Sequence, residues 1–136
     1  MHNEDLYEFA RQKQIIVEQM KIPKNKSLSA RIQNKDFIAI DKCVMENSAE
    51  ERTHLAHELG HCETGAFYEM YSPFEVRGKA EYKANKWAVL KCIPKDELVG
   101  LLKKGYQRWE LAEHFGVTEK FVETACTYYF EYGIAI

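Results

Sequence analysis

Several features that would assign the chain to a specialised class are missing from its sequence. No apolar run approaches the roughly 20 residues of a membrane-spanning helix, and the polar, acidic first five residues are unlike a secretory signal. The 4 cysteines never occur in C-x-x-C spacing, which favours reduced thiols and a cytoplasmic location. A formal net charge of −2 and a pI near 6.2 provide no basic surface for nucleic acid or an anionic membrane.

What remains is an ordinary globular composition, with 46% hydrophobic and 29% charged residues. A length of 136 residues suits one domain with a real core and is too short for two comfortable ones. The sequence contains no internal repeat, low-complexity tract or linker. We therefore expect a single domain over residues 1–136.

Hydrophobic periodicity, proline and turn residues predict a mostly helical α+β fold with a small antiparallel sheet. Two short strands are expected at residues 28–32 and 37–40, joined by a turn-rich link. Helices are expected at residues 3–20, 48–63, 76–91, 94–105, 109–115 and 119–132.

The most informative feature is the run His57-Glu58-Leu59-Gly60-His61, an H-E-x-x-H motif. Residues four apart lie on one face of a helix, so His57 and His61 can direct both imidazoles at one metal ion. Glu58 is offset by one position, which places its carboxylate beside the metal, where a general base takes a proton from a metal-bound water. The motif thus predicts two zinc ligands and a base.

Chance, or a solvated helical histidine pair, is the alternative, since the chain carries 5 histidines. The neighbouring residues argue against it. His54 falls on the same arc as the motif, while Leu55, Leu59 and Cys62 fall on an adjacent apolar arc. The residues 48–51 read as a capping box that begins this helix, so the motif lies in the helical context that it requires.

A catalytic zinc site usually has three protein ligands. A third histidine soon after the motif is missing, because Phe67 stands where it would fall. The other common solution is a glutamate on a following helix, and Glu81 fits best, since alanines on the same side allow a close approach to the motif helix. Asn85, one turn on, could orient a ligand from behind. Glu69 and Glu75 are weaker candidates, and Glu81 could instead be a solvated carboxylate near a helix start.

The runs H-E-L-G-H at 57–61, E-Y-K-A-N-K-W-A at 81–88 and I-P at 93–94 resemble the ImmA/IrrE-type metallopeptidase domain. That family shows H-E-L-G-H, then E-x-x-A-N/D-x-F-A, then a proline, so Trp87 replaces the usual phenylalanine. The match spans roughly residues 36–95. By this resemblance, His57, His61 and Glu81 bind Zn²⁺ and Glu58 is the general base of a zinc metallopeptidase.

The resemblance also implies a substrate. Family members are often encoded by prophages or mobile elements and cleave helix-turn-helix repressors, so the expected partner is such a protein, with no direct nucleic acid and no membrane. The strand before the motif helix, residues 37–41, could be the sheet edge that pairs with an extended substrate, or could simply pack in the core. His54, Tyr68 and Tyr71 are candidate oxyanion donors, although a surface position is the expectation for His54.

Residues 111–122 resemble a helix-turn-helix signature, which raises a rival function: a regulator or adaptor that binds DNA or a repressor through this hairpin. Charge argues against DNA. From residue 105 to 136 there are two basic and five acidic residues, a net charge of −3, which phosphates would repel. We therefore expect residues 1–93 to form a catalytic core and residues 94–136 a C-terminal helical subregion that closes the domain.

Overall fold

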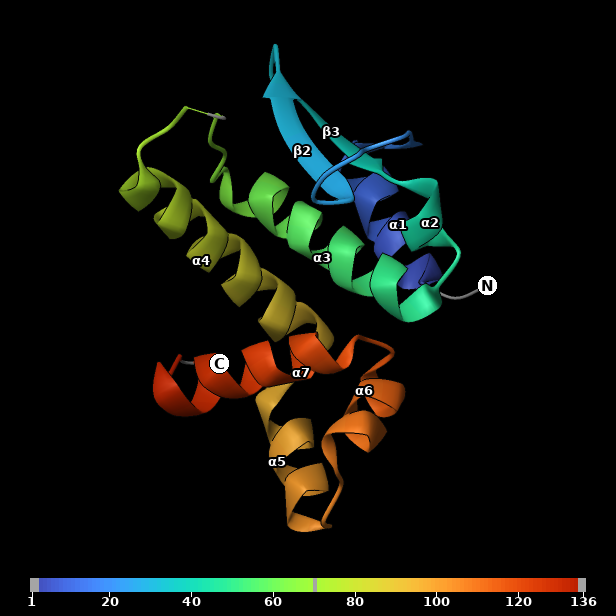
Figure 1. The fold of residues 1–136 in the computed structure, drawn as a ribbon, viewed down its shortest axis with the longest axis vertical. Coiled ribbons are helices and arrows are strands. Elements are labelled where there is room, and N and C mark those ends of the chain that lie inside the picture. Colours follow the sequence, from blue (N-terminus) through green and yellow to red (C-terminus); the bar gives the residue numbers. More distant parts are fainter. Residues whose placement is uncertain (1–2, 70, 135–136) are drawn as a thin grey trace.

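The computed structural model describes residues 3–69 and 71–134, which form seven α-helices and a three-stranded sheet (Figure 1). The sheet lies on one side of α3 and α4 lies on the other, with α5 to α7 beyond one end of α4. This arrangement confirms the mostly helical α+β class. The elements are α1 (Glu4–Gln12), β1 (Ile16–Gln19), β2 (Ser27–Ile32), β3 (Lys35–Ile40), α2 (Lys42–Met45), α3 (Ser48–Thr64), α4 (Phe74–Cys92), α5 (Lys95–Lys103), α6 (Arg108–Phe115) and α7 (Glu119–Cys126), which continues into a π-helical turn (Thr127–Glu131).

The sheet is mixed rather than wholly antiparallel, because it contains a strand that the sequence pattern did not predict. The order is β1-β3-β2, with β1 parallel and β2 antiparallel to β3. The predicted first helix ends at Gln12, and Gln14 then adopts a left-handed conformation, with φ 59°, that no helix can continue. The β-branched Ile16 and Val17 follow in β1, where such residues are favoured.

The central position of β3 decides between the two alternatives left open for this strand, a sheet edge or packing in the core. Ile38, Ala39 and Ile40 are buried, so this strand packs in the core. The edge beside the motif helix is β2, which in the described part of the chain pairs only with β3. The strands β2 and β3 form a hairpin joined by a two-residue turn. Gln33 and Asn34 both adopt positive φ, as a type I′ turn requires, and this turn fixes the register of the two strands.

The motif helix begins one residue earlier than a capping box with Ser48 as its N-cap would place it. Asn47 is the N-cap, and its side chain accepts hydrogen bonds from the backbone N–H groups of Ala49 and Glu50, at 3.1 and 3.0 Å. At the other end, Gly65 terminates the helix in the left-handed conformation. The helix thus spans the motif, as predicted.

The helices α3 and α4 approach closely along a line of small residues. A Cβ atom added at Gly60 would lie 2.4 Å from the backbone oxygen of Ala84, so only glycine fits there. Ala80 and Ala88, one turn to either side of Ala84, are also buried. The predicted close approach of the two helices is therefore confirmed.

The C-terminal hairpin is tied to the motif helix. Gly116, with φ 70°, makes the turn between α6 and α7, and Val117 and Val122 pack in the core. The backbone N–H of Thr118 donates to the Thr53 hydroxyl on α3 at 3.1 Å. Among the described helices, none combines the length and apolar character needed to cross a membrane.

Candidate metal centre

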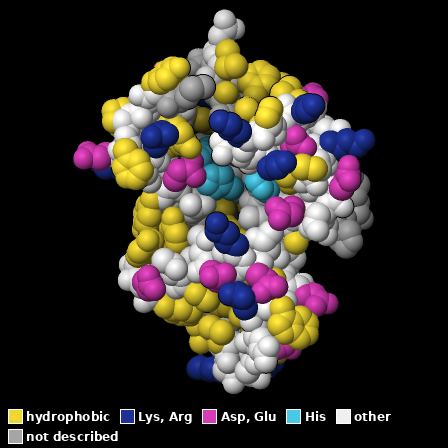
Figure 2. All heavy atoms as spheres, viewed as in Figure 1, with side chains coloured by type: hydrophobic (Ala, Val, Ile, Leu, Met, Phe, Trp, Pro, Cys, Tyr) yellow, Lys and Arg dark blue, Asp and Glu magenta, His cyan; other side chains and the backbone are white. Residues whose placement is uncertain are grey.

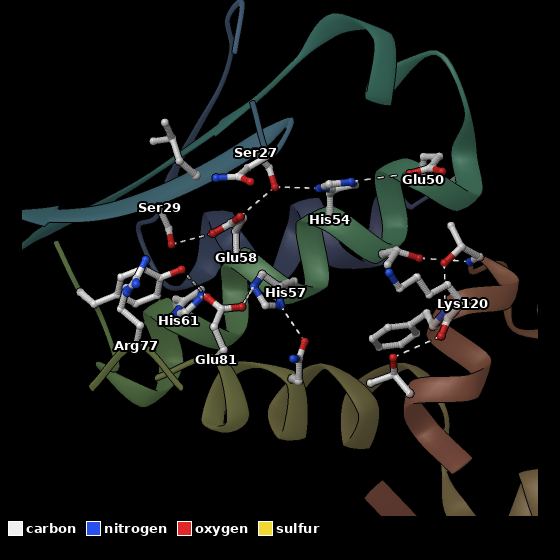
Figure 3. A pocket seen from close by; sticks show the side chains of 18 of the residues that line it. Ser27, Ser29, Glu50, His54, His57, Glu58, His61, Arg77, Glu81 and Lys120 are labelled. Carbon is white, nitrogen blue, oxygen red and sulfur yellow. Dashed lines mark hydrogen bonds and ion pairs between the residues drawn. The ribbon is translucent and has the colours of Figure 1, made fainter. Parts of the chain in front are cut away.

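Two histidines from α3 and one glutamate from α4 converge across the line of small residues. The Nε2 atoms of His57 and His61 each lie 3.0 Å from a different carboxylate oxygen of Glu81 (Figure 3). The ligand atoms of all three residues lie within 4.8 Å of one another. The contact between Gly60 and Ala84 sets this separation, because it fixes how near Glu81 can come to the motif helix.

Both imidazole rings are held through their Nδ1 atoms, on the side opposite Glu81. The Nδ1 atom of His57 lies 2.8 Å from Asn85 Oδ1, and that of His61 lies 2.6 Å from the backbone oxygen of Ala66. Since both partners are acceptors, each Nδ1 carries a proton, and each ring turns its Nε2 atom toward Glu81. Partners of this kind orient metal-binding histidines, so the position of Asn85 agrees with its predicted role.

The electrostatics of the cluster favour a positive charge between the two histidines and Glu81. Burial raises the pKa of the Glu81 carboxyl, but hydrogen bonds from the two imidazoles and Tyr68 outweigh it and hold the pKa well below its usual range. Burial lowers the pKa of His57, but the nearby carboxylates of Glu81 and Glu58 outweigh it and raise the pKa overall. Lone pairs of nitrogen and oxygen at 3.0 Å need a cation between them, either a proton or a metal ion.

Two imidazoles and one carboxylate suit zinc, with further positions open for water and substrate. A tetrahedral zinc with bonds of about 2.0–2.1 Å separates its ligand atoms by roughly 3.3 Å, which is near the two nitrogen–oxygen distances of 3.0 Å and within the 4.8 Å that encloses all three ligand atoms. Cys62 is no part of this set, because its side chain is buried in the hydrophobic core. The loop alternatives, Glu69 and Glu75, are exposed and lie outside the cluster.

Glu58 points away from the cluster toward the sheet and is 5% exposed. Its two carboxylate oxygens accept hydrogen bonds from the hydroxyls of Ser27 and Ser29 on β2, each at 2.7 Å. The Ser27 hydroxyl also lies 2.7 Å from His54 Nδ1. The expectation of a surface position for His54 is therefore wrong: its side chain is largely covered, with 24% exposed, and belongs to the surroundings of Glu58.

Of the two tyrosines in the following loop, the structure places only one in the site. The Tyr68 hydroxyl donates to Glu81 Oε1 at 2.8 Å, and its ring centroid lies 6.0 Å from that of His61. Tyr71 is 90% exposed and does not line the cleft. Tyr68 thus holds a hydroxyl beside the candidate metal ligands.

The cluster lies in a cleft of about 990 Å³ between the sheet and the C-terminal hairpin. Figure 2 shows the histidines in a hollow between the upper and lower parts of the molecule. One wall is β2, and the opposite wall includes Thr118, Lys120, Phe121 and Thr124 at the start of α7. The hairpin therefore contributes to the same cleft as the motif.

Ser27 and Ser29 were not predicted from the sequence to belong to the site. The signal available was their alternation, S-L-S in a strand, which places both hydroxyls on one face. Nothing local indicates that this face would lie against Glu58, about 30 residues further on.

Comparison with known proteins adds an independent result. Neither the curated proteins nor the solved structures provide a match. A family model of peptidases, described as the IrrE N-terminal-like domain, matches residues 10–127 and so takes in the sheet, the motif helix, the Glu81 helix and the hairpin. The chain belongs to this IrrE N-terminal-like peptidase family.

Proposed function

We propose that this protein is a zinc-dependent endopeptidase in which Glu58 is the general base. The observation that carries the proposal is the placement of His57, His61 and Glu81 around one point, with the Glu58 carboxylate on the next residue of the same helix. When bound, zinc supplies Lewis acidity, which lowers the pKa of a coordinated water and polarises the scissile carbonyl.

The protein's own side chains bind the ion, transfer the proton and stabilise the developing charge. His57, His61 and Glu81 hold the ion, with the first two fixed by their Nδ1 contacts. Glu58 accepts the proton of the attacking water and delivers it to the leaving amine. Tyr68 donates its hydroxyl hydrogen to the carbonyl oxygen as negative charge develops there.

The proposed substrate is a protein segment in extended conformation. The edge of β2 runs along the cleft and offers backbone groups that can pair with such a segment. From the family likeness, the substrate is a helix-turn-helix repressor of a phage or mobile element, and the reaction takes place in the cytoplasm.

The test is cleavage of a purified helix-turn-helix repressor encoded beside this chain. Wild-type protein loaded with zinc is expected to cut it at one bond, and chelation is expected to stop the reaction. Glu58→Gln is expected to bind zinc normally and to cleave at least about 100-fold more slowly, since a positioned base contributes 10²–10⁴-fold. Equal cleavage by wild type and Glu58→Gln would contradict the proposal.

One observation supports the alternative function, an adaptor that binds a repressor through the C-terminal hairpin. The start of α7 forms a wall of the cleft, so the hairpin can contact a protein bound there. DNA is a poor partner for it. Arg108, one of its two basic residues, already pairs with Glu119 and Glu123 at 2.9 and 3.2 Å. Salt-sensitive binding of duplex DNA by the full chain would favour the regulator over the peptidase.

A further inference from the structure

We propose that Ser27 and Ser29 are positioning residues that keep Glu58 available as a base and off the metal, and that His54 sets the direction of the Ser27 hydrogen bond. The inference rests on the proposed peptidase function. It concerns three residues to which that function gives no role.

The geometry shows a clamp on the carboxylate. Ser27 and Ser29 are two apart in β2, so both side chains face α3. Each hydroxyl donates to a different oxygen of Glu58 at 2.7 Å, which fixes the plane of the carboxylate as well as its position (Figure 3). A terminal carboxylate rotates easily without such partners, because its last torsion has broad, shallow minima.

The directions of the hydrogen bonds that Ser27 makes with Glu58 and His54 follow from which atoms carry a proton. A carboxylate only accepts, so Ser27 donates its single proton to Glu58 Oε2. The contact of 2.7 Å between Ser27 Oγ and His54 Nδ1 must then be donated by the imidazole. His54 is thereby held with its proton on Nδ1, while Nε2 faces Glu50 at 3.6 Å, too far for a hydrogen bond.

The two serine hydrogen bonds matter for the chemistry because Glu58 is next in sequence to His57, a candidate metal ligand. A carboxylate is itself a good zinc ligand, so an unrestrained Glu58 beside the ion is free to bind it and lose its function as a base. The two serine hydroxyls hold both oxygens on the sheet side of the helix, away from the cluster of His57, His61 and Glu81.

The kinetic test uses zinc-loaded Ser29→Ala and the double variant Ser27→Ala with Ser29→Ala, on a peptide spanning the bond cut in the repressor. We expect kcat to fall about tenfold and about 100-fold respectively, the scale of a misplacement near 1 Å, with KM changed less than twofold. Ser29→Thr, which keeps the hydroxyl in a residue favoured in strands, is expected to retain wild-type kcat. Unchanged kcat in the double variant would overturn the inference.

Zinc affinity separates positioning from general damage to the site. Zinc titration of the metal-free double variant is expected to show binding at least as tight as wild type, and up to about tenfold tighter if Glu58 joins the ligands. Binding more than tenfold weaker would mean that the serines support the ligands themselves, and would overturn the proposed role.

The tautomer of His54 gives a readout without catalysis. In nitrogen–proton correlation spectra of the metal-free protein, we expect His54 as the Nδ1–H tautomer in wild type and a shift toward Nε2–H in Ser27→Ala. An Nε2–H tautomer in wild type would refute the hydrogen-bond directions. A wild type that binds zinc and cleaves nothing would overturn the proposed function, whereas a cleaving wild type matched by the double variant would overturn only this inference.

Discussion

Replacing Gly60 with alanine tests how the candidate metal ligands are brought together. The added Cβ would lie 2.4 Å from the backbone oxygen of Ala84, and contacts under 3.0 Å essentially never occur. Reaching 3.0–3.4 Å requires α3 and α4 to separate by about 0.6–1.0 Å. The obstacle is backbone rather than a flexible side chain, so the helices themselves must move.

Overpacking of this kind costs about 1–3 kcal/mol, from which the better helix propensity of alanine subtracts up to about 1 kcal/mol. A net loss near 1–2 kcal/mol is therefore expected in the free energy of unfolding, measured with urea on metal-free protein. The same separation moves Glu81 away from the two histidines, so zinc affinity is expected to fall about tenfold or more.

Gly78→Ala is the matched control, because it lies on the facing helix and its Cβ would have no neighbour within 4 Å. This variant is expected to be as stable as wild type or more stable by up to about 1 kcal/mol, with unchanged zinc affinity. If Gly60→Ala behaved like Gly78→Ala in both assays, the claim that this contact sets the ligand geometry would be refuted.

Three further predictions concern the loop tyrosine, an acid-sensitive cap and the metal. Tyr68→Phe is expected to lower kcat about 10–100-fold with little change in zinc affinity. Tyr71→Phe, at a 90% exposed position, is expected to change neither kcat nor zinc affinity. Equal kcat values for the two variants would show that Tyr68 takes no part in the chemistry. A hydrogen bond with the Cys43 side chain, together with those from the backbone N–H groups of Ile22 and Cys43, lowers the pKa of Asp41 from 3.8 to about 2. The contribution of Asp41 to stability is therefore present above about pH 4 and lost as the pH falls toward 2. In acid unfolding, Asp41→Asn is expected to lose less stability than wild type over this interval, and an identical loss would contradict the assignment. Zinc at 100 times its dissociation constant is expected to stabilise the fold by about 2.7 kcal/mol, measured as a rise in the unfolding midpoint that His61→Ala abolishes.

The sequence was sufficient for features with a local period. Ligands four residues apart on one helix predicted a shared direction for His57 and His61, and the structure has it. The alanine-lined face of the next helix predicted the approach of Glu81. Both inferences used the helical repeat alone, which any amphipathic segment displays in its sequence.

What the sequence could not supply depends on contacts between distant segments. Residues 16–19 look like the end of a helix until β3 provides a partner for them, so tertiary pairing overrode local periodicity. Ser27 and Ser29 gain their role only because β2 packs on α3 beside Glu58. His54 was expected at the surface for the same reason, since Ser27, 27 residues earlier, supplies its partner.

X-ray absorption of the zinc-loaded protein can show directly whether His57, His61 and Glu81 hold the ion. We expect one zinc per chain, two imidazole nitrogens and oxygen ligands at about 2.0–2.2 Å, and no sulfur at about 2.3 Å. Failure to take up zinc, or a sulfur ligand from Cys62 beside His61, would contradict this assignment of the ligands.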